Sequence, residues 1–257
     1  MDEDAAFELF KRLRWPDTEG RPECPHCGHE RCYTIRTRRQ FKCAACRRMF
    51  SVTSGTLFHS HKLELRDYLL VVAIFMNAVK GVSASQVSRE VGISYKAAFV
   101  LLHKLREAVA DGRGSMRVGG DVEIDGYYVG GKRRPANQGR EGPRRPARSP
   151  KRCVVAAVSR SGGTVTTVIG AENTADILQF ARRRTIGVNT MFADEHPGYD
   201  ALHARYAMKR INHRWAYSDA GATTNAAESF FARMRRGEVG QYHRPNGPYL
   251  DRYAAEM

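Results

Sequence analysis

The sequence predicts an α+β protein with several domains, and three observations lead to this fold class. Two Cys-x2-Cys pairs lie near the N-terminus of the 257 residues. A stretch of helical periodicity follows them. Strand and helix patterns then alternate as far as the C-terminus. We expect an N-terminal helix over 1–18, a small cysteine-rich ribbon over 19–60, a helical segment over 61–112, and an α/β domain with a mixed sheet flanked by helices over 113–257.

The charge balance indicates the kind of partner. The chain has 42 Lys and Arg against 27 Asp and Glu, a net charge of +15. Such an excess favours a polyanion such as nucleic acid over a basic surface without function. The acidic start is unlike a signal peptide, and the longest apolar run, Tyr68 to Met76, is too short to span a bilayer. We expect a cytoplasmic, nucleoid-associated protein without a membrane partner.

The four N-terminal cysteines follow the spacing C-x2-C-x15-C-x2-C: Cys24, Cys27, Cys43 and Cys46. This spacing predicts a zinc ribbon, in which four thiolates hold a structural Zn²⁺ and leave no open position. Two disulfides are the alternative, which a reducing compartment disfavours. Between the cysteine pairs, on an expected β-hairpin, lie the basic residues Arg36, Arg38, Arg39 and Lys42. Both DNA contact and a merely solvated surface are compatible with them.

The helical segment resembles a helix-turn-helix. Leu63 to Val79 is apolar on most faces and predicts a buried helix. Beyond it, Ser83 and Gln86 can form the capping box of a first helix, in which Val87 and Val91 share a face. Gly92 suits a turn, and Ser94 can cap a second helix with apolar residues at helical spacing, namely Ala98, Leu101, Leu102 and Leu105. The first turn of that helix leaves Tyr95 and Lys96 free to enter a major groove. Many helical hairpins share this pattern without binding DNA, but the neighbouring basic ribbon favours the DNA-binding interpretation.

The stretch 120–126 alternates acidic and aliphatic residues. In a strand, Asp121, Glu123 and Asp125 would share one face, and the aliphatic residues the other. This stretch alone favours a solvent-exposed edge strand. Two later acids point instead to a metal site. Asp194 follows a short apolar run, and Glu228 lies early in a helical run.

A basic segment follows the acidic strand. Residues 132–152 contain nine basic residues and one acidic residue, with several prolines and glycines. They predict a flexible loop, with Arg144 and Arg145 as candidates for DNA contact. A solvated loop without a ligand is the alternative.

The remaining pattern is strand, hairpin, helix, strand and helix, which is the order of an RNase H-like fold. That fold places one acid on the first strand, one after the fourth and one on a later helix. Here those acids would be Asp125, Asp194 and Glu228. Carboxylates suit Mg²⁺ or Mn²⁺, and a pair of such ions can activate a water or a 3′-hydroxyl. Each acid also has an ordinary interpretation, as a solvated strand residue, a turn former, and a capping-box partner of Asn225, respectively.

Five motifs resemble those of bacterial insertion-sequence transposases that join an N-terminal zinc ribbon to an RNase H-like DDE (ISXO2-like) catalytic domain. They cover nearly the whole chain: CPHCG with CAAC, FSVTSGTLFHSHKL, VEIDGYYVGGKRRP, ADEHPGYDALHARYAMKRINH, and TNAAESFFARMRRGEVGQYH. The resemblance implies DNA cleavage and strand transfer at element ends. It implies Asp125, Asp194 and Glu228 as Mg²⁺ or Mn²⁺ ligands, with Asn225 as the reserve for the third, and Arg235 as a phosphate contact.

The expected partners are double-stranded DNA, as terminal inverted repeats and as target, and further copies of the chain assembled on it. Two alternatives remain. One is a non-catalytic DNA-binding protein, either a regulator or a decayed transposase. The other is an RNase H-like nuclease without strand transfer. Relatives continue beyond Tyr249–Met257 into further basic sequence, so we expect the catalytic domain to be truncated at its C-terminus.

Overall fold

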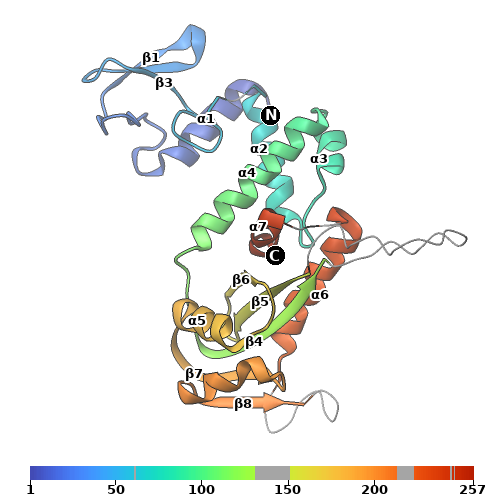
Figure 1. Cartoon of the computed structure of the whole chain (residues 1–257). Helices are drawn as coiled ribbons and strands as arrows, with labels where there is room; N and C mark the ends of the chain where they lie inside the picture. Colours follow the sequence, from blue (N-terminus) through green and yellow to red (C-terminus); the bar gives the residue numbers. More distant parts are fainter. Residues whose placement is uncertain (61, 131–150, 213–222, 244, 246) are drawn as a thin grey trace, which may run out of the picture. The chain divides into compact units, whose positions relative to one another are not determined.

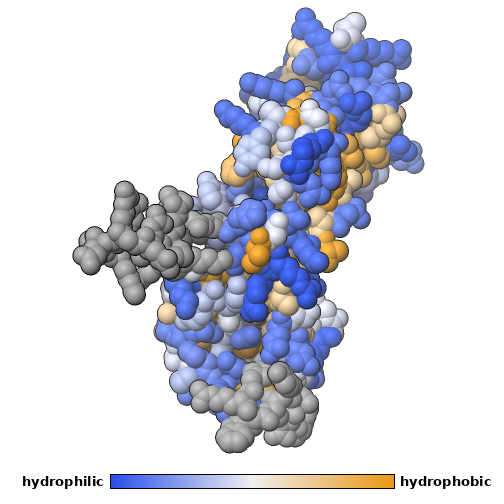
Figure 2. All heavy atoms as spheres, turned by 90° about the vertical axis from the view of Figure 1, so that its right-hand side faces the viewer, coloured by the Kyte–Doolittle hydropathy of each residue, from blue (hydrophilic) through white to orange (hydrophobic). Residues whose placement is uncertain are grey.

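The computed structural model describes residues 1–60, 62–130, 151–212, 223–243, 245 and 247–257 (Figure 1). The chain forms two compact units. The first comprises 1–78 and 84–105, and the second comprises 79–83 and 106–257. Within the described residues, every helix is too short or too polar to cross a membrane. Hydrophilic residues cover most of the face in Figure 2, with smaller apolar patches between them.

The first unit combines a three-stranded antiparallel sheet with helices. In chain order its elements are α1 (Glu3–Arg14), η1 (Pro16–Thr18), β1 (Cys32–Ile35), η2 (Arg36–Arg38), β2 (Gln40–Cys43), β3 (Met49–Ser51), α2 (Leu65–Asn77), α3 (Ala84–Val91) and the start of α4 (Tyr95–Arg113). Phe41 on the middle strand is fully buried. Its ring centroid lies 6.0 Å from that of Phe7 and 5.7 Å from that of Trp15. One face of the sheet therefore packs on α1 and the residues after it.

Helix α2 is less buried than its composition predicts. Leu65, Val71 and Phe75 are buried, but Leu70 is 43% exposed and Met76 is 72% exposed. The expectation of a helix buried on most faces is therefore wrong. The buried residues of α2, Leu65, Tyr68, Val71 and Phe75, recur every three or four positions and so form a single stripe of the helix.

Helices α3 and α4 form the expected helical hairpin. Gly92 in the turn has φ +77°, a conformation that glycine adopts without the steric cost of a Cβ. Ser94 Oγ accepts a hydrogen bond from Ala97 N at 3.2 Å and so caps α4. Val87 and Leu102 are fully buried. Both helices thus bury apolar positions that the periodicity indicated.

The second unit contains a five-stranded mixed sheet. Its elements are β4 (Val118–Val129), β5 (Arg152–Ser159), β6 (Thr164–Ile169), α5 (Thr174–Arg184), β7 (Thr185–Asp194), η3 (Pro197–Ala204), β8 (Met208–Ile211), α6 (Asn225–Gly237), η4 (Glu238–Tyr242), η5 (Gly247–Tyr249) and α7 (Leu250–Glu256). The strand order is β6-β5-β4-β7-β8. β5 is antiparallel to β4 and β6, whereas β7 is parallel to β4 and β8. This is the RNase H-like topology, and it confirms the predicted fold.

The acidic stretch lies on the central strand of this sheet. β4 pairs with β5 on one side and with β7 on the other. The edge-strand interpretation of residues 120–126 is therefore wrong. The interpretation is wrong because strand pairing depends on distant parts of the chain. Alternation correctly separates the two faces of a strand, but it does not indicate whether the strand pairs on one side or on both.

Helices cover both faces of the sheet (Figure 1). Ile177 and Phe180 of α5 pack with Val122 and Ile124 on one face. On the other face, α6 and α7 contribute a second apolar cluster with residues of β4 and β5, whose members include Phe230, Phe231, Met234, Leu250, Val154 and Ala156. The acids of β4 point toward the α6 face, because they alternate with Val122 and Ile124. The helix that carries Glu228 therefore packs on the face to which Asp125 points.

Candidate active site and DNA-binding surface

The four ribbon cysteines form one compact group. Their sulfur atoms all lie within 4.8 Å of one another, and Cys24–Cys46 and Cys27–Cys43 are separated by 3.6 Å. A disulfide needs about 2.05 Å, whereas tetrahedral zinc with bonds of about 2.3 Å places sulfurs about 3.8 Å apart. The geometry therefore fits zinc, and the thiols are free rather than paired as disulfides.

Backbone N–H groups lower the pKa of one of these thiols and so favour its cation-binding thiolate form. Burial acts to raise the pKa of Cys43, but hydrogen bonds from the N–H groups of Cys46 and Ala45 lower it to about 6. The Cys46 N–H lies 3.4 Å from the Cys43 sulfur. The thiolate is the form that binds zinc. This N–H arrangement comes from the tight turn between β2 and β3.

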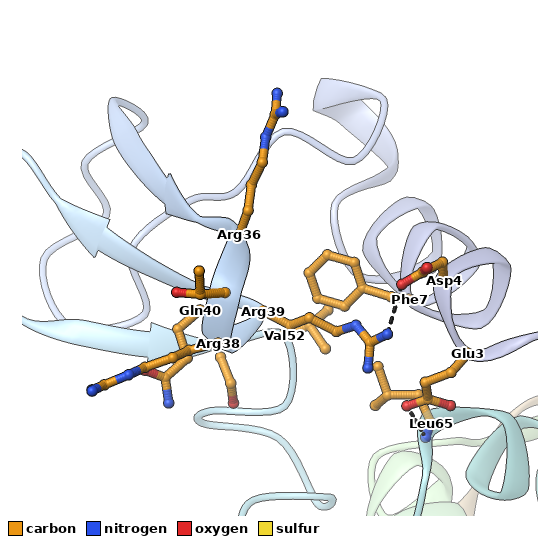
Figure 3. A pocket seen from close by; sticks show the side chains of 11 residues that line it. Glu3, Asp4, Phe7, Arg36, Arg38, Arg39, Gln40, Val52 and Leu65 are labelled. Carbon is orange, nitrogen blue, oxygen red and sulfur yellow. Dashed lines mark hydrogen bonds and ion pairs between the residues drawn. The ribbon is translucent and has the colours of Figure 1, made fainter.

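Among the hairpin cations, Arg39 differs from its neighbours. Arg39 forms an ion pair with Asp4 of α1 at 2.7 Å, beside a pocket that both elements line (Figure 3). Arg36 and Arg38 are exposed and point away from Asp4 in that view. Lys42 is also exposed, in register with Tyr33 and Met49. Three of the four predicted DNA-binding cations therefore face solvent without an ion-pair partner among the described residues.

The first turn of α4 presents the residues proposed for a DNA groove. Tyr95 is 56% exposed, and Lys96 is also exposed. The Tyr95 ring stacks on that of Phe99, with 6.1 Å between centroids. Arg144 and Arg145, proposed for the basic loop, lie outside the described residues.

Asp125 and Asp194 lie on neighbouring parallel strands. Ile124 pairs with Ala193, so the two acids follow side by side. Adjacent strands are about 4.8 Å apart. Asp194 Oδ1 also accepts a hydrogen bond from His196 N at 3.0 Å, so this acid serves the turn as well. Arg210 of β8 donates to the carbonyls of Asp194 and His196 and fixes the backbone there.

Glu228 reaches the same region from α6. Two hydrogen bonds connect the N-terminus of α6 to β4. Glu123 Oε2 accepts them from Ala226 N at 2.6 Å and from Ala227 N at 3.2 Å. Glu228 is exposed in the first turn. Its Oε1 accepts a hydrogen bond from the Thr224 hydroxyl at 3.3 Å. Thr224, not Asn225, occupies the N-cap position, so the capping-box interpretation of Asn225 with Glu228 does not hold.

Electrostatics link the three acids. Burial raises the pKa of Asp125 to about 7, and repulsion from Asp194, Glu172 and Glu228 adds to this against a hydrogen bond from Gly126 N. Asp194 and Glu228 are thus near enough to Asp125 to raise its pKa. Their oxygens do not all lie within 4.8 Å, a distance that only the cysteine group meets within the described part of the chain. The donor set consists of oxygens alone, which suits a hard divalent cation.

Two family models match this chain. Residues 117–257 match the family model described as an ISXO2-like transposase domain, and residues 1–49 match a transposase zinc-ribbon domain. The chain belongs to the ISXO2-like transposase family.

One curated relative is an uncharacterized protein in transposable element ISH50 of Halobacterium salinarum. It is 28% identical over 132 residues, which are 50% of this chain and 42% of the relative, so the chain spans less than half of that protein's length. Two solved structures also match: the Mos1 strand transfer complex (15% identity, TM-score 0.32, covering 74% of this chain and 70% of that one) and the Mos1 transposase paired-end complex with left transposon end (14%, 0.30, 74% and 71%). With TM-scores this low, the fold assignment rests on the strand order instead.

A fourth carboxylate of this family member was not predicted from the sequence. Glu172, between β6 and α5, accepts a hydrogen bond from the buried Tyr199 hydroxyl at 2.8 Å. A Cβ at Gly126 would lie 2.0 Å from Glu172 Oε1, so any larger residue after Asp125 would force this carboxylate to shift. Glu172 lies in a connection with no periodicity. Only the topology brings it beside Asp125.

Arg235 lies on α6, two turns beyond Glu228. Its guanidinium is 5.2 Å from the ring centroid of Tyr127. Tyr127 belongs to the same face of β4 as Asp125, and its hydroxyl donates to Glu238 at 3.1 Å. Arg235 is exposed. The structure therefore places an accessible cation beside the acidic strand, as a phosphate contact would require.

Proposed function

We propose that this chain binds the ends of an insertion sequence and catalyses metal-dependent DNA cleavage and strand transfer. Asp125, Asp194 and Glu228 would hold the metal ions. One observation carries the proposal: in a chain of the ISXO2-like transposase family, Asp194 and Glu228, from two other elements of the RNase H-like unit, lie close enough to Asp125 to raise its pKa.

The donor set fits Mg²⁺ or Mn²⁺. Such an ion, when bound, stabilises charge on the attacking and leaving oxygens of a phosphate diester. Asp125 must lose its proton to act as a ligand. Asp194 is oriented by the His196 N–H, and Glu228 by the Thr224 hydroxyl. Arg235 is suited to hold a phosphate beside them.

DNA binding is assigned mainly to the first unit. Its exposed cations, Arg36, Arg38 and Lys42, suit phosphate contacts, and Tyr95 and Lys96 suit base edges in a major groove. Arg39 would have to exchange Asp4 for a phosphate, so its contribution is expected to be smaller. Arg144 and Arg145 remain sequence-based candidates, as does assembly of several copies on the DNA.

The test is an assay on the DNA ends that flank the gene, with and without Mg²⁺. We expect cleaved ends and joined strands only with the metal, and neither product from Asp125→Asn. Cleavage without joined strands would favour an RNase H-like nuclease. Specific end binding without cleavage would favour the non-catalytic DNA-binding alternative.

A further inference from the structure

Arg160, which follows β5, contacts two of the elements that carry the proposed metal ligands, β4 and β7, and the segment just before the third, α6. Its Nε donates to Glu123 Oε1 at 2.8 Å, and Glu123 precedes Asp125 by two residues on β4. Its Nη2 donates to the Thr223 carbonyl, just before α6, at 3.1 Å. Its guanidinium also lies 3.6 Å from the ring centroid of Phe192, two residues before Asp194 on β7. One side chain therefore joins β4, β7 and the start of α6.

Glu123 completes this connection from the central strand. Its side chain is 2% exposed. One oxygen accepts from Arg160, and the other accepts from the N–H groups of Ala226 and Ala227. A carboxylate at a helix N-terminus satisfies donors that have no partner inside the helix and interacts favourably with its dipole. Because both oxygens are engaged, Glu123 acts on the site through α6 rather than as a further ligand.

We propose that Glu123 and Arg160 are positioning residues, which set Glu228 against Asp125 and Asp194 for metal binding. This inference rests on the proposed function of the three acids. In this ion pair the carboxylate is buried, whereas the Arg160 side chain is 30% exposed. A buried carboxylate is costly unless its oxygens are satisfied, and here the donors that satisfy them come from Arg160 and from the start of α6, so the hydrogen bonds fix these segments in one register on β4.

Two substitutions each disturb a different part of this hydrogen-bond network. Glu123→Gln replaces one acceptor oxygen by an NH₂ donor, so either Arg160 or the α6 N–H groups must face a donor. Arg160→Lys keeps the charge but lacks the planar fork that bonds Glu123 and Thr223 together. Both changes should loosen the start of α6 while leaving the cysteine group intact.

The experiment measures Mn²⁺ affinity by calorimetry, on the full-length, zinc-saturated protein well below its unfolding temperature. Substitution of a residue that orients metal ligands typically lowers metal affinity about 10- to 100-fold. We expect at least about a tenfold loss in Glu123→Gln and in Arg160→Lys, with no further loss in the double variant. The Mn²⁺ concentration for half-maximal end cleavage should rise by the same factor, and end binding should not change.

Glu256→Gln is the matched control. Glu256, like Glu123, is a buried carboxylate of the second unit that pairs with an arginine, here Arg106 at 2.7 Å, with side-chain exposures of 4% for Glu256 and 3% for Arg106. Its substitution should lower the unfolding temperature without changing Mn²⁺ affinity. Should Glu123→Gln fail to fold, Arg160→Lys carries the test.

Two results would overturn the inference in distinguishable ways. A wild-type protein that neither binds Mn²⁺ nor cleaves ends would remove the proposed function and this inference with it. A wild-type protein that does both, beside Glu123 and Arg160 variants whose Mn²⁺ affinity changes no more than that of Glu256→Gln, would overturn the positioning role alone.

Discussion

At Asp125 the fold keeps a carboxylate partly buried beside other acids. Its pKa is raised to about 7, chiefly by burial, whereas the unfolded value is about 3.9. The folded state thus binds the proton more tightly than the unfolded state does. For an acid with a raised pKa, ionisation destabilises the fold. The metal-free protein should therefore lose stability as pH rises from about 4 to about 7.

The first prediction follows from this loss of stability when Asp125 ionises. Without Mg²⁺ or Mn²⁺, Asp125→Asn should raise the unfolding temperature of the second unit at pH 8, because the amide carries no charge. The gain should shrink as pH falls below about 7 and vanish near pH 4. Thermal unfolding of both proteins across this range measures it. Added Mn²⁺ should stabilise only the wild type, and an Asn variant less stable than wild type at pH 8 would contradict the argument.

A second prediction concerns Gly126. In Gly126→Ala the new methyl group would displace the Glu172 carboxylate, which leaves the buried Tyr199 hydroxyl without its acceptor. An unsatisfied buried group costs about 1–3 kcal/mol, so the free energy of unfolding should fall by about that amount. Urea titration measures it. Tyr199→Phe removes the donor instead and is the comparison. If Gly126→Ala costs as much in the Tyr199→Phe background as alone, the loss has another cause.

Among the elements of the fold, we expect the strands of the ribbon to depend on a bound metal. The three strands of its sheet have three or four residues each, too few to fold on strand pairing alone. Cys43→Ser should lose zinc and unfold residues 19–60, while the second unit keeps its unfolding transition. Metal analysis and hydrogen exchange measure both effects. Cys32→Ser is the matched control and should retain one zinc per chain, because Cys32 is outside the four-cysteine group. Zinc retained by Cys43→Ser would show that the ligand set is wrong.

Local patterns predicted much of this molecule. Cysteine spacing was enough for the metal group, and alternation correctly placed Glu123 and Asp125 on one face of β4. Alternation could not show that Glu123 caps α6, since the N–H groups it binds lie about a hundred residues later. The same applies to Glu172, and to Arg160 in the turn between β5 and β6. These residues act through contacts that exist only once the sheet has its strand order.

For the whole molecule, the two units divide the proposed work. The exposed cations of the ribbon and of the first turn of α4 belong to the first unit, and the three acids belong to the second. Changes in one unit should therefore leave the proposed function of the other largely intact. Phosphate contacts and base contacts within the first unit should also separate, because only base contacts depend on sequence.

The last prediction tests this division. Replacing Arg36 and Arg38 together by Ala should weaken binding to element ends and to random DNA about equally, and should lower the salt dependence by about two counterions. Lys96→Ala should instead reduce the preference for element ends by about tenfold, as expected for one base contact. Fluorescence anisotropy at several salt concentrations measures both. Asp125→Asn is the control and should bind ends like the wild type. If the arginine variant lost only its preference for ends while Lys96→Ala weakened all binding, the two assignments would be reversed.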